Sequence, residues 1–362
     1  MAVKQKYVRL DGLLKVDAEY NILLGERSNG KSYCVKEFVL KNFKKSGGKF
    51  IYLRRYNLET KPATVEGYFR DAPVRAIFDD GSDSIKPYRG SIYLSRYDLE
   101  MEKDVRGEEI GYYMDLAGET HFKSQNFNDV TDVIFEEFVT DQGYLYREVD
   151  KLMNIISTIA RRRRIRVWMI GNTISRLCPY FSEWSLSGIP KQEQGTIQVY
   201  EHETDQEDDD GNPITVKIAV YFCENSGKNS KMFFGKSTDM ITKGAWQTRS
   251  YPHLPYHYRK CQNKYSILYK YKEFLFKMEV LRYHEDGIDD MMIFIHPHKK
   301  LEDGFRTISD IPSSRPLITE HLTTVTRGDK VVKMLWDQGK VFYSDNLTGS
   351  DFEAILADKG EL

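Results

Sequence analysis

The segment Gly25 to Ser32 limits the possible folds more than any other part of this 362-residue sequence. It reads GERSNGKS, which matches the phosphate-binding P-loop pattern GxxxxGKS without deviation. An apolar run at 20–24 leads into it, and apolar residues recur at helical spacing from Val35 to Phe43. A second strand-like run follows at 49–55, so this part of the chain predicts a βαβ unit. We therefore expect a nucleotide site at the edge of a mostly parallel α/β sheet.

Each part of the motif has a physical role toward phosphate. Its glycines let backbone N–H groups surround phosphate oxygens, and the start of the following helix adds a partial positive charge. Lys31 is expected to reach the β- and γ-phosphates of ATP, and the hydroxyl of Ser32 is expected to ligate Mg²⁺. The residues expected to bind ATP are Gly25, Glu26, Arg27, Ser28, Asn29, Gly30, Lys31, Ser32 and Tyr33.

A second apolar run, VTDVIFEEF at 130–138, contains two adjacent carboxylates near its end. P-loop ATPases hold Mg²⁺ and polarise water with such a pair. We predict that Glu136 binds the metal, through a water, and that Glu137 is the general base. The commoner pattern has Asp before Glu, so Glu136 is one methylene longer than usual. Asn172 ends a strand predicted at 165–172 and is either a γ-phosphate sensor or a turn-forming residue.

Composition adds a few exclusions. The formal net charge is −1, so bulk charge does not indicate a nucleic-acid binder. The four cysteines are far apart and none has CxxC spacing, which argues against a zinc site or a disulfide framework and for a reducing compartment. No apolar stretch reaches the length of a membrane span, and the N-terminus lacks the apolar core of a signal peptide. We expect a soluble, intracellular protein.

Strand and helix patterns alternate up to about residue 190 and then change. We predict an ATPase domain at 1–190, a β-hairpin linker or lid at 191–232, and a C-terminal domain at 233–362. That last domain contains a predicted strand pair and helical stretches near 313–326 and 350–357.

A dense basic run follows the helix that is predicted to end near Ala160. It consists of five arginines in the six positions 161–166. Favourable charge at a helix C-terminus explains one or two of them. The others indicate either an arginine finger, which neutralises charge on the γ-phosphate of a neighbouring subunit, or a patch that contacts the phosphates of DNA or RNA.

Together these segments resemble the genome-packaging ATPase of small tailed bacteriophages, a relative of large terminase subunits. The matching pieces are NILLGERSNGKSY, KFIYLRRY, VTDVIFEEF, IARRRRIRVWMIGN and the CPYF that follows, and they cover the first domain. The resemblance implies a P-loop (ASCE-type) ATPase domain followed by an RNase H-like α+β domain. It implies a homomeric ring, a pentamer, that docks on the portal of an empty capsid in the host cytoplasm and pumps double-stranded DNA inward with ATP. It leaves open whether a structural RNA takes part.

The resemblance also implies a trans-acting arginine finger. That position falls at Arg161 if one residue is deleted from the preceding helix, and Arg162 and Arg164 are the alternatives. Lys123 matches a lysine of the family near the subunit boundary, or else it is an ordinary surface lysine.

The loop that follows the second strand is a candidate DNA contact. Arg55, Asn57 and Lys61 lie where members of this family touch DNA in the pore, and a solvated loop is the alternative.

Large terminases cut DNA with a second domain that holds two metals on carboxylates at strand ends. Here the run FLFKMEV carries Glu279, but no clear Asp stands in the expected place. Asp286, Asp289 and Asp290 cluster in a turn, where such residues are common. We predict a nuclease-like fold without nuclease activity. The alternatives are a packaging enzyme that also cuts DNA and a nucleotide switch that moves nothing; a small-molecule kinase is disfavoured by the paired carboxylates and the chain length.

Overall fold

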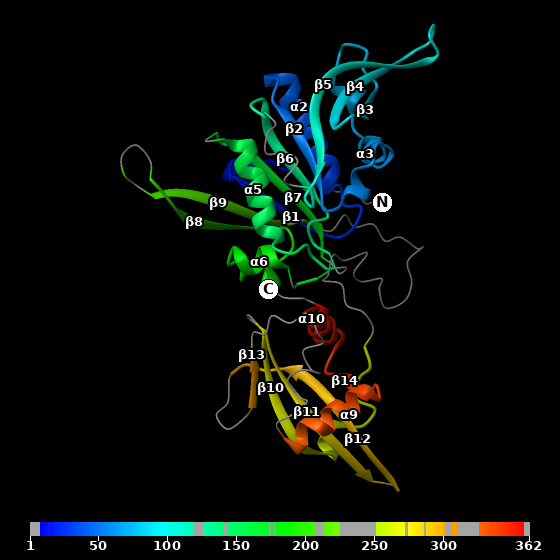
Figure 1. Cartoon of the computed structure of the whole chain (residues 1–362), viewed down its shortest axis with the longest axis vertical. Helices are drawn as coiled ribbons and strands as arrows, with labels where there is room; N and C mark the ends of the chain where they lie inside the picture. The colour runs from blue at the N-terminus through cyan, green and yellow to red at the C-terminus, as the bar shows by residue number, and fades with distance from the viewer. Residues whose placement is uncertain are drawn as a thin grey trace, which may run out of the picture.

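The computed structural model describes residues 8–118, 126–140, 143–161, 163–173, 175–176, 178–207, 211, 213–224, 251–271, 274–285, 287–300, 306–309 and 326–357. Within these ranges the chain forms two β-sheets, each with its own helices (Figure 1). None of the helices there is both long and apolar enough to cross a membrane.

The first sheet has the strand order β3-β4-β5-β2-β6-β7-β1-β9-β8. The strands from β5 to β9 in this order pair in parallel, whereas β3, β4 and β8 pair antiparallel at the two edges. This confirms the predicted mostly parallel sheet. The strands are β1 Tyr20–Gly25, β2 Lys49–Arg54, β3 Ser84–Tyr88, β4 Ser91–Asp98, β5 Lys103–Asp115, β6 Val130–Glu136, β7 Arg166–Asn172, β8 Ile197–Glu207 and β9 Pro213–Phe222.

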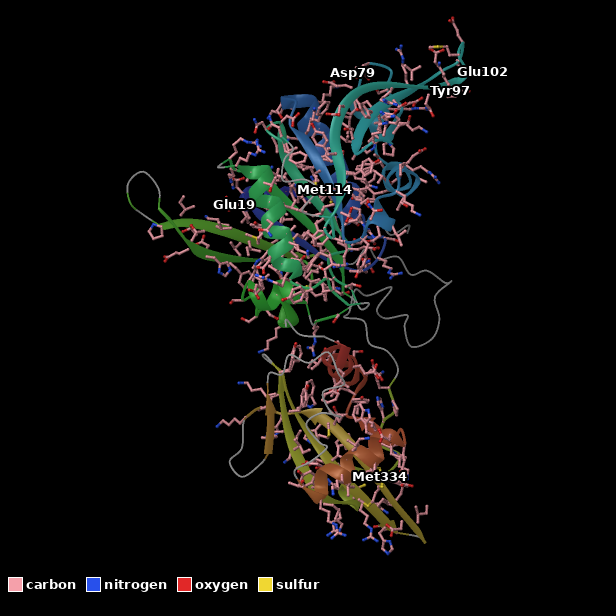
Figure 2. All side chains as sticks on the ribbon, viewed as in Figure 1. Glu19, Asp79, Tyr97, Glu102, Met114 and Met334 are labelled. Atoms are coloured by element: carbon pink, nitrogen blue, oxygen red, sulfur yellow. The ribbon has the colours of Figure 1, made fainter. Side chains whose placement is uncertain are left out.

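Helices cover both faces of this sheet because its central strands are apolar on both sides. In β1, Ile22 and Leu24 pack with α5 and α6, and Leu23 packs on the opposite face with α1 to α4. The helices are α1 Asp11–Val16, α2 Lys31–Ser46, α3 Pro62–Phe69, α4 Val74–Ile77, α5 Glu148–Ala160 and α6 Pro179–Glu183, with short 3₁₀ turns η1 Asn57–Thr60 and η3 Ile189–Lys191. Figure 2 shows Tyr97 and Glu102 near the tip of the β4–β5 hairpin, which projects from the body of the sheet.

The β8–β9 hairpin is part of the first sheet. Residues 191–232 were expected to form a β-hairpin that acts as a linker or lid; the hairpin is present as β8 and β9, and β9 also pairs in parallel with β1, with Tyr20 opposite Ile218 and Leu24 opposite Phe222. Ile218, Ala219 and Val220 are almost fully buried. A continuous apolar run of this kind is typical of a strand covered on both faces, which explains why it extends the first sheet.

The second sheet has the order β13-β10-β11-β12-β14. The predicted strand pair consisted of ILYKYKEFLFKMEVLRY and MMIFIHP. The second run lies in β12 as expected, but the first is divided into two strands, β10 and β11, which pair antiparallel with each other. β12 continues the antiparallel arrangement, while β13 and β14 add parallel edges. Its elements are β10 Cys261–Tyr271, β11 Phe274–Glu285, β12 Ile288–Pro297, β13 Arg306–Ser309, β14 Val341–Tyr343, α9 Arg327–Asp337, α10 Asn346–Ala357 and the turn η4 Tyr258–Lys260.

Both helices of this second unit pack against one face of its sheet through apolar side chains such as Leu335 and Phe352. The helix expected near 350–357 is part of α10, and α9 was not predicted. The helix expected near 313–326 lies outside the described residues except for Thr326, which caps α9 with its side chain. The two units meet at the ion pair between Arg176, after β7, and the buried Asp351 of α10.

Candidate nucleotide site

The P-loop connects the end of β1 to the start of α2. Gly30 has φ of 93°, in the left-handed region that glycine adopts readily, and directly precedes the first residue of α2. At Gly25 the backbone passes close to its neighbours, since an added Cβ would lie 3.0 Å from Asn29 Nδ2 and 3.3 Å from Cys223 Cβ. A side chain at Gly30 would strain the backbone and one at Gly25 would crowd its neighbours, so the loop requires glycine at both positions.

Lys31 is buried under this loop, and the hydrogen-bond partners of its ammonium among the described residues are neutral oxygens. Nζ donates to the carbonyls of Gly25 (3.3 Å) and Glu26, and to the side-chain oxygens of Asn29 (3.1 Å) and Asn172 (3.3 Å). Burial lowers the pKa of Lys31, because the loss of hydration outweighs the attraction of the nearby acidic groups, Glu136 among them. A bound anion would compensate the positive charge of Lys31.

Asn29 gives independent support for an anion. Its Nδ2 is buried and has no hydrogen-bond partner among the described residues. A buried amide donor without an acceptor is costly, and a phosphate oxygen would supply one. The loop thus fits a phosphate group by both charge and hydrogen-bonding capacity.

Ser32 and Glu136 lie together at the next position of the site. Ser32 Oγ donates to Glu136 Oε1 at 2.6 Å, and Tyr68 OH donates to Glu136 Oε2 at 3.1 Å. Burial raises the pKa of Glu136. A hydroxyl and a carboxylate at this separation provide the oxygen ligands that Mg²⁺ prefers, so these residues fit the metal.

Glu137 follows the end of β6 in a left-handed conformation, with φ of 56°. Its side chain is 57% exposed and accepts a hydrogen bond from Arg54 Nη2 at 2.7 Å. Arg54 also pairs with Glu59 of the turn η1. The guanidinium of Arg54 thus joins the predicted general base to the loop that follows β2.

Asn172 lies beside the P-loop because β7 is the direct neighbour of β1 and Gly25 is opposite Asn172 in the register. Its hydrogen bond with Lys31 brings Lys31, Ser32, Glu136 and Asn172 to one edge of the sheet. The remaining P-loop residues predicted to bind ATP, Glu26, Arg27, Ser28 and Tyr33, belong to the same loop and the first turn of α2.

Comparison with known proteins identifies the family of the chain. The family model for the Podovirus DNA encapsidation protein (Gp16) matches residues 3–204, which include the whole site described above. The chain belongs to this family.

Relatives in sequence agree with that assignment. The DNA packaging proteins of Bacillus phage B103 and Bacillus phage phi29 are each 32% identical to this encapsidation-family chain over 178 residues, or 48% of its length. The match covers 50% and 48% of those two proteins, so the chain spans about half the length of the curated relatives it matches. A chain of the bacteriophage Phi-29 viral genome packaging motor assembly is 20% identical, covers 97% of this chain and 98% of its own length, and has a TM-score of 0.51; this likeness shows the fold alone.

The DNA contact predicted for Arg55 is contradicted by its burial in this family member. The side chain is 6% exposed and pairs with Glu148, at the start of α5, through Nε at 2.8 Å and Nη2 at 3.0 Å. Nη1 and Nη2 also donate to the carbonyls of Glu137 (3.1 Å) and Phe138 (2.7 Å). With four of its five N–H donors used inside the protein and its side chain buried, Arg55 holds the turn of Glu137 in place and is not accessible to a DNA phosphate.

Asn57 and Lys61 remain candidates for DNA contact. Both are exposed, Asn57 at the start of η1 and Lys61 directly before α3. Asn57 Nδ2 donates to Asp115 at 3.3 Å.

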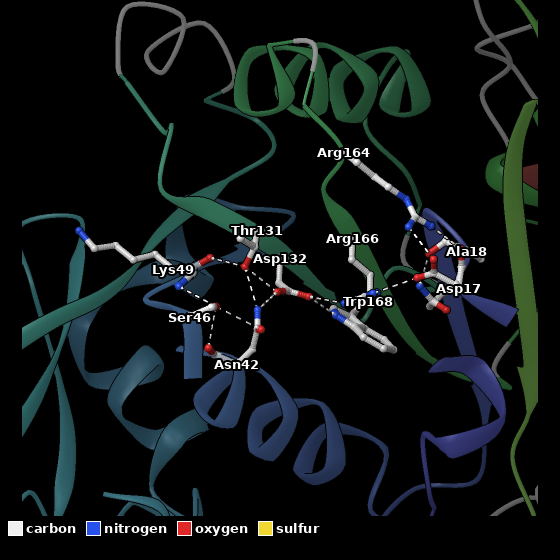
Figure 3. A network of polar contacts seen from close by, with 12 residues as sticks. Asp17, Ala18, Asn42, Ser46, Lys49, Thr131, Asp132, Arg164, Arg166 and Trp168 are labelled. Carbon is white, nitrogen blue, oxygen red and sulfur yellow. Dashed lines mark hydrogen bonds and ion pairs between the residues drawn. The ribbon is translucent and has the colours of Figure 1, made fainter. Parts of the chain in front are cut away.

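The arginine run is largely explained by the fold. Arg164 and Arg166 pair with Asp17, Arg164 also pairs with Glu19 at 2.7 Å, and Arg166 lies 3.8 Å from Asp132 (Figure 3). These contacts surround the amino end of β7, whereas the nucleotide site lies at its carboxyl end. Figure 3 shows the network continuing from Asp132 to Trp168 and Asn42.

The other arginines of the run differ in their surroundings. Arg163 donates to the carbonyls of Phe127, Val130 and Ile159. Arg161 is exposed at the end of α5, where its N–H donates to Ser157 O at 3.2 Å. Arg162 and Lys123 lie outside the described residues.

In the second unit, Glu279 is buried and hydrogen-bonded to Tyr258 (2.8 Å) and Asn263 (2.6 Å), with His296 at 3.5 Å. Asp289 pairs with Arg282 and Asp290 with Lys340, and Asp286 lies outside the described residues. Across the part of the chain that the structure describes, no group of three or more His, Cys, Asp or Glu side chains is arranged to hold a metal.

Sequence reasoning missed three residues of the site: Arg54, Tyr68 and Glu148. Arg54 stands in the segment that carried the family resemblance, so that pattern could have indicated it. Tyr68 and Glu148 have no local signal, because each reaches the site from a helix whose orientation depends on tertiary packing.

Proposed function

We propose that this chain is an ATPase motor that moves double-stranded viral DNA into a preformed capsid, hydrolysing ATP at the subunit interfaces of a homomeric ring. The observation that carries this proposal is the grouping of Lys31, Ser32, Glu136 and Asn172 at one edge of a parallel sheet in a DNA encapsidation family member. The printed names of the relatives, DNA packaging proteins, support the same role.

Each side chain of the site has a defined task in this proposal. Lys31 binds the β- and γ-phosphates, with the loop amides and Asn29 Nδ2 donating to the remaining oxygens. Ser32 and Glu136 are the residues that would hold Mg²⁺, which when bound neutralises charge on the transferred phosphoryl group. Asn172 reaches the γ-phosphate from the neighbouring strand.

Glu137 accepts the proton of the attacking water in this proposal. Its hydrogen bond with Arg54 fixes the carboxylate at one position, and the carbonyl of Glu137 is held by Arg55. Because a general base must stand within hydrogen-bond reach of its water, these two arginines determine whether Glu137 can act.

We further propose that Arg161 is the finger that acts on the neighbouring subunit's γ-phosphate. It lies at an exposed helix end, at the position that the family resemblance gives for the finger. The alternative Arg164 lies at the amino end of β7, away from the edge that carries the nucleotide site. A pentameric ring on the capsid portal follows from the family resemblance.

Mixed rings test the proposed site and finger together. Lys31→Ala and Arg161→Ala proteins should each hydrolyse ATP poorly alone. An equimolar mixture should regain turnover, since an intact P-loop then meets an intact arginine across some interfaces. A matched mixture of Lys31→Ala with Glu137→Ala should regain no turnover. Lys31 and Glu137 each act in the site of their own subunit, so neither protein can complete the site of the other. Normal turnover by Lys31→Ala alone would refute the nucleotide site, and absence of rescue at every ratio would refute the finger at Arg161.

The second unit, from residue 251 onward, is proposed to be a separate RNase H-like α+β domain without nuclease activity, and the ATPase domain is proposed to include the β8–β9 hairpin. The mixed sheet with helices on one face supports the α+β arrangement. The pairing of Asp289 and Asp290 with basic side chains supports a structural role for these acids. Cleavage of plasmid DNA by the whole chain with Mg²⁺ or Mn²⁺, abolished by Glu279→Gln, would contradict the proposed inactivity.

A further inference from the structure

Both carboxylate oxygens of Glu136 are held, and they are held from different elements. Ser32, in the first turn of α2, donates to Oε1 at 2.6 Å. Tyr68, near the end of α3, donates to Oε2 at 3.1 Å. The first hydrogen bond follows from the P-loop motif, and the second comes from a residue that no part of the motif requires.

The hydroxyl of Tyr68 is itself fixed in position. Its ring stacks on the buried ring of Tyr52 of β2, with centroids 4.4 Å apart, and contacts Phe69 edge-on. The ammonium of Lys36, from α2, lies 4.6 Å from the ring centroid and donates to the carbonyl of Tyr68 at 2.8 Å. Lys36 is 3% exposed and also pairs with Asp71. The sheet and α2 thus place this one hydroxyl at the metal-binding end of the site.

We propose that Tyr68 is a positioning residue that orients Glu136 toward Mg²⁺. This inference rests on the proposed function of the nucleotide site. A glutamate has one more rotatable bond than the aspartate usual at this position, so its carboxylate has more orientations to lose when it binds a metal. The hydrogen bond from Tyr68 to Oε2 restricts the orientation of the carboxylate before the metal binds.

The same geometry explains why glutamate stands at this position. An aspartate would place its carboxylate about 1.5 Å closer to the backbone, one carbon–carbon bond short of the observed oxygens. Such a carboxylate cannot keep the bonds to Ser32 and Tyr68 together. Tyr68 and Glu136 therefore form a matched pair, and the contribution of the tyrosine should depend on the length of the acid.

Tyr68→Phe is the decisive variant, because it keeps the ring that stacks on Tyr52 and removes only the hydroxyl. Binding of a non-hydrolysable ATP analogue is measured by calorimetry over a series of Mg²⁺ concentrations and in EDTA, and direct Mn²⁺ binding in the presence of that analogue is followed by electron paramagnetic resonance. We expect affinity in EDTA to be unchanged and the midpoint for Mg²⁺ to rise about tenfold, the effect typical of removing one hydrogen bond to a charged group. Mn²⁺ affinity should fall by a similar factor.

Tyr93→Phe is the matched control, since Tyr93 OH also donates to a glutamate, Glu109, at 3.2 Å, on the edge strands β4 and β5. It should leave the Mg²⁺ midpoint unchanged. In a Glu136→Asp background, Tyr68→Phe should produce no further shift, because the shorter acid no longer reaches the tyrosine hydroxyl.

The outcomes distinguish failure of the positioning role from failure of the proposed function. An unshifted Mg²⁺ midpoint in Tyr68→Phe, an equal loss of affinity with and without metal, or a full further shift in the Glu136→Asp background would each overturn the positioning role. Absence of Mg²⁺-dependent nucleotide binding by the unaltered chain would refute the proposed function and this inference with it.

Discussion

Replacing Arg55 by methionine distinguishes a buried structural arginine from a DNA-contacting one. The side chains of Arg55 and Glu148 are 6% and 1% exposed, and their two hydrogen bonds measure 2.8 and 3.0 Å. In Arg55→Met the carboxylate of Glu148 would stay buried opposite an apolar side chain, with two neutral donors, Tyr180 OH and the Leu145 N–H, as its partners among the described residues.

The expected cost follows from that burial. Removing one partner of a buried ion pair costs about 3–5 kcal/mol, a large part of the roughly 5–15 kcal/mol that stabilises a typical domain. Glu148→Met should cost a similar amount. The double variant should cost clearly less than the sum of the two, because neither charge is then left without its partner. Lys41→Met, which removes the exposed pair with Glu37, is the control and should cost no more than about 0.5 kcal/mol.

Urea denaturation of the whole chain, followed by tryptophan fluorescence, measures these differences. Trp168 is fully buried in the first sheet and reports on its unfolding. ATP turnover is measured in parallel at a temperature where the variants are folded, and it should fall in the double variant because the carbonyl of Glu137 loses its donor. If Arg55→Met instead unfolded like the unaltered chain and reduced the salt dependence of DNA binding, the assignment of Arg55 to the interior would be refuted.

Three further predictions concern the site and its surroundings. Glu137→Gln should bind ATP normally and release phosphate at least about a hundredfold more slowly, since the amide cannot take a proton; weakened ATP binding would contradict its role as the base. Arg164→Ala should lower the free energy of unfolding at pH 7 by no more than about 1 kcal/mol, because Arg164 and Asp17 are 50% and 53% exposed. This variant should still supply the arginine finger to the site of a neighbouring subunit. The hydrogen bond from Arg164 holds the pKa of Asp17 below its usual 3.8, so the stabilisation by this pair is present above that value and disappears as the pH falls through the lowered pKa. If the difference in free energy of unfolding between the variant and the unaltered chain became smaller already near about pH 6, the pairing of Arg164 with Asp17 would not be its source. Lys61→Ala should weaken binding to all DNA sequences alike and reduce the slope of log affinity against log salt by about 0.9 for each DNA phosphate that is no longer neutralised; an unchanged slope would show that Lys61 does not touch DNA.

Local sequence patterns predicted the elements that build the nucleotide site. The run before Gly25, the helical spacing after Ser32 and the apolar strand before Glu136 each lie within one element, and a single element's periodicity is visible in the sequence. Because carboxyl ends of parallel strands meet at one edge, the motif also indicated that Ser32, Glu136 and Asn172 would lie close together.

The arginine pair at the end of β2 shows the limit of predictions from local patterns. Arg54 and Arg55 are adjacent, and neighbouring side chains at a strand end point to opposite faces. Arg54 turns toward Glu59 and Glu137, whereas Arg55 turns toward α5 and is buried by it. Alternation predicts that the two differ, but only the packing of α5 decides which of them is covered.

The same limit applies to pairings between distant segments. The two acids that bind Arg164, Asp17 and Glu19, precede β1 and are 147 and 145 residues away in sequence. Likewise, β9 reaches β1 from a part of the chain that was expected to be a linker. Tyr68 reaches Glu136 from a helix that carries no site motif. The sequence by itself indicated the residues that we propose to bind phosphate and metal, because those depend on a short loop and on strand ends. The tertiary structure decided which arginines are buried, which acid each one neutralises and which hydroxyl orients Glu136, because these depend on how elements distant in sequence pack together.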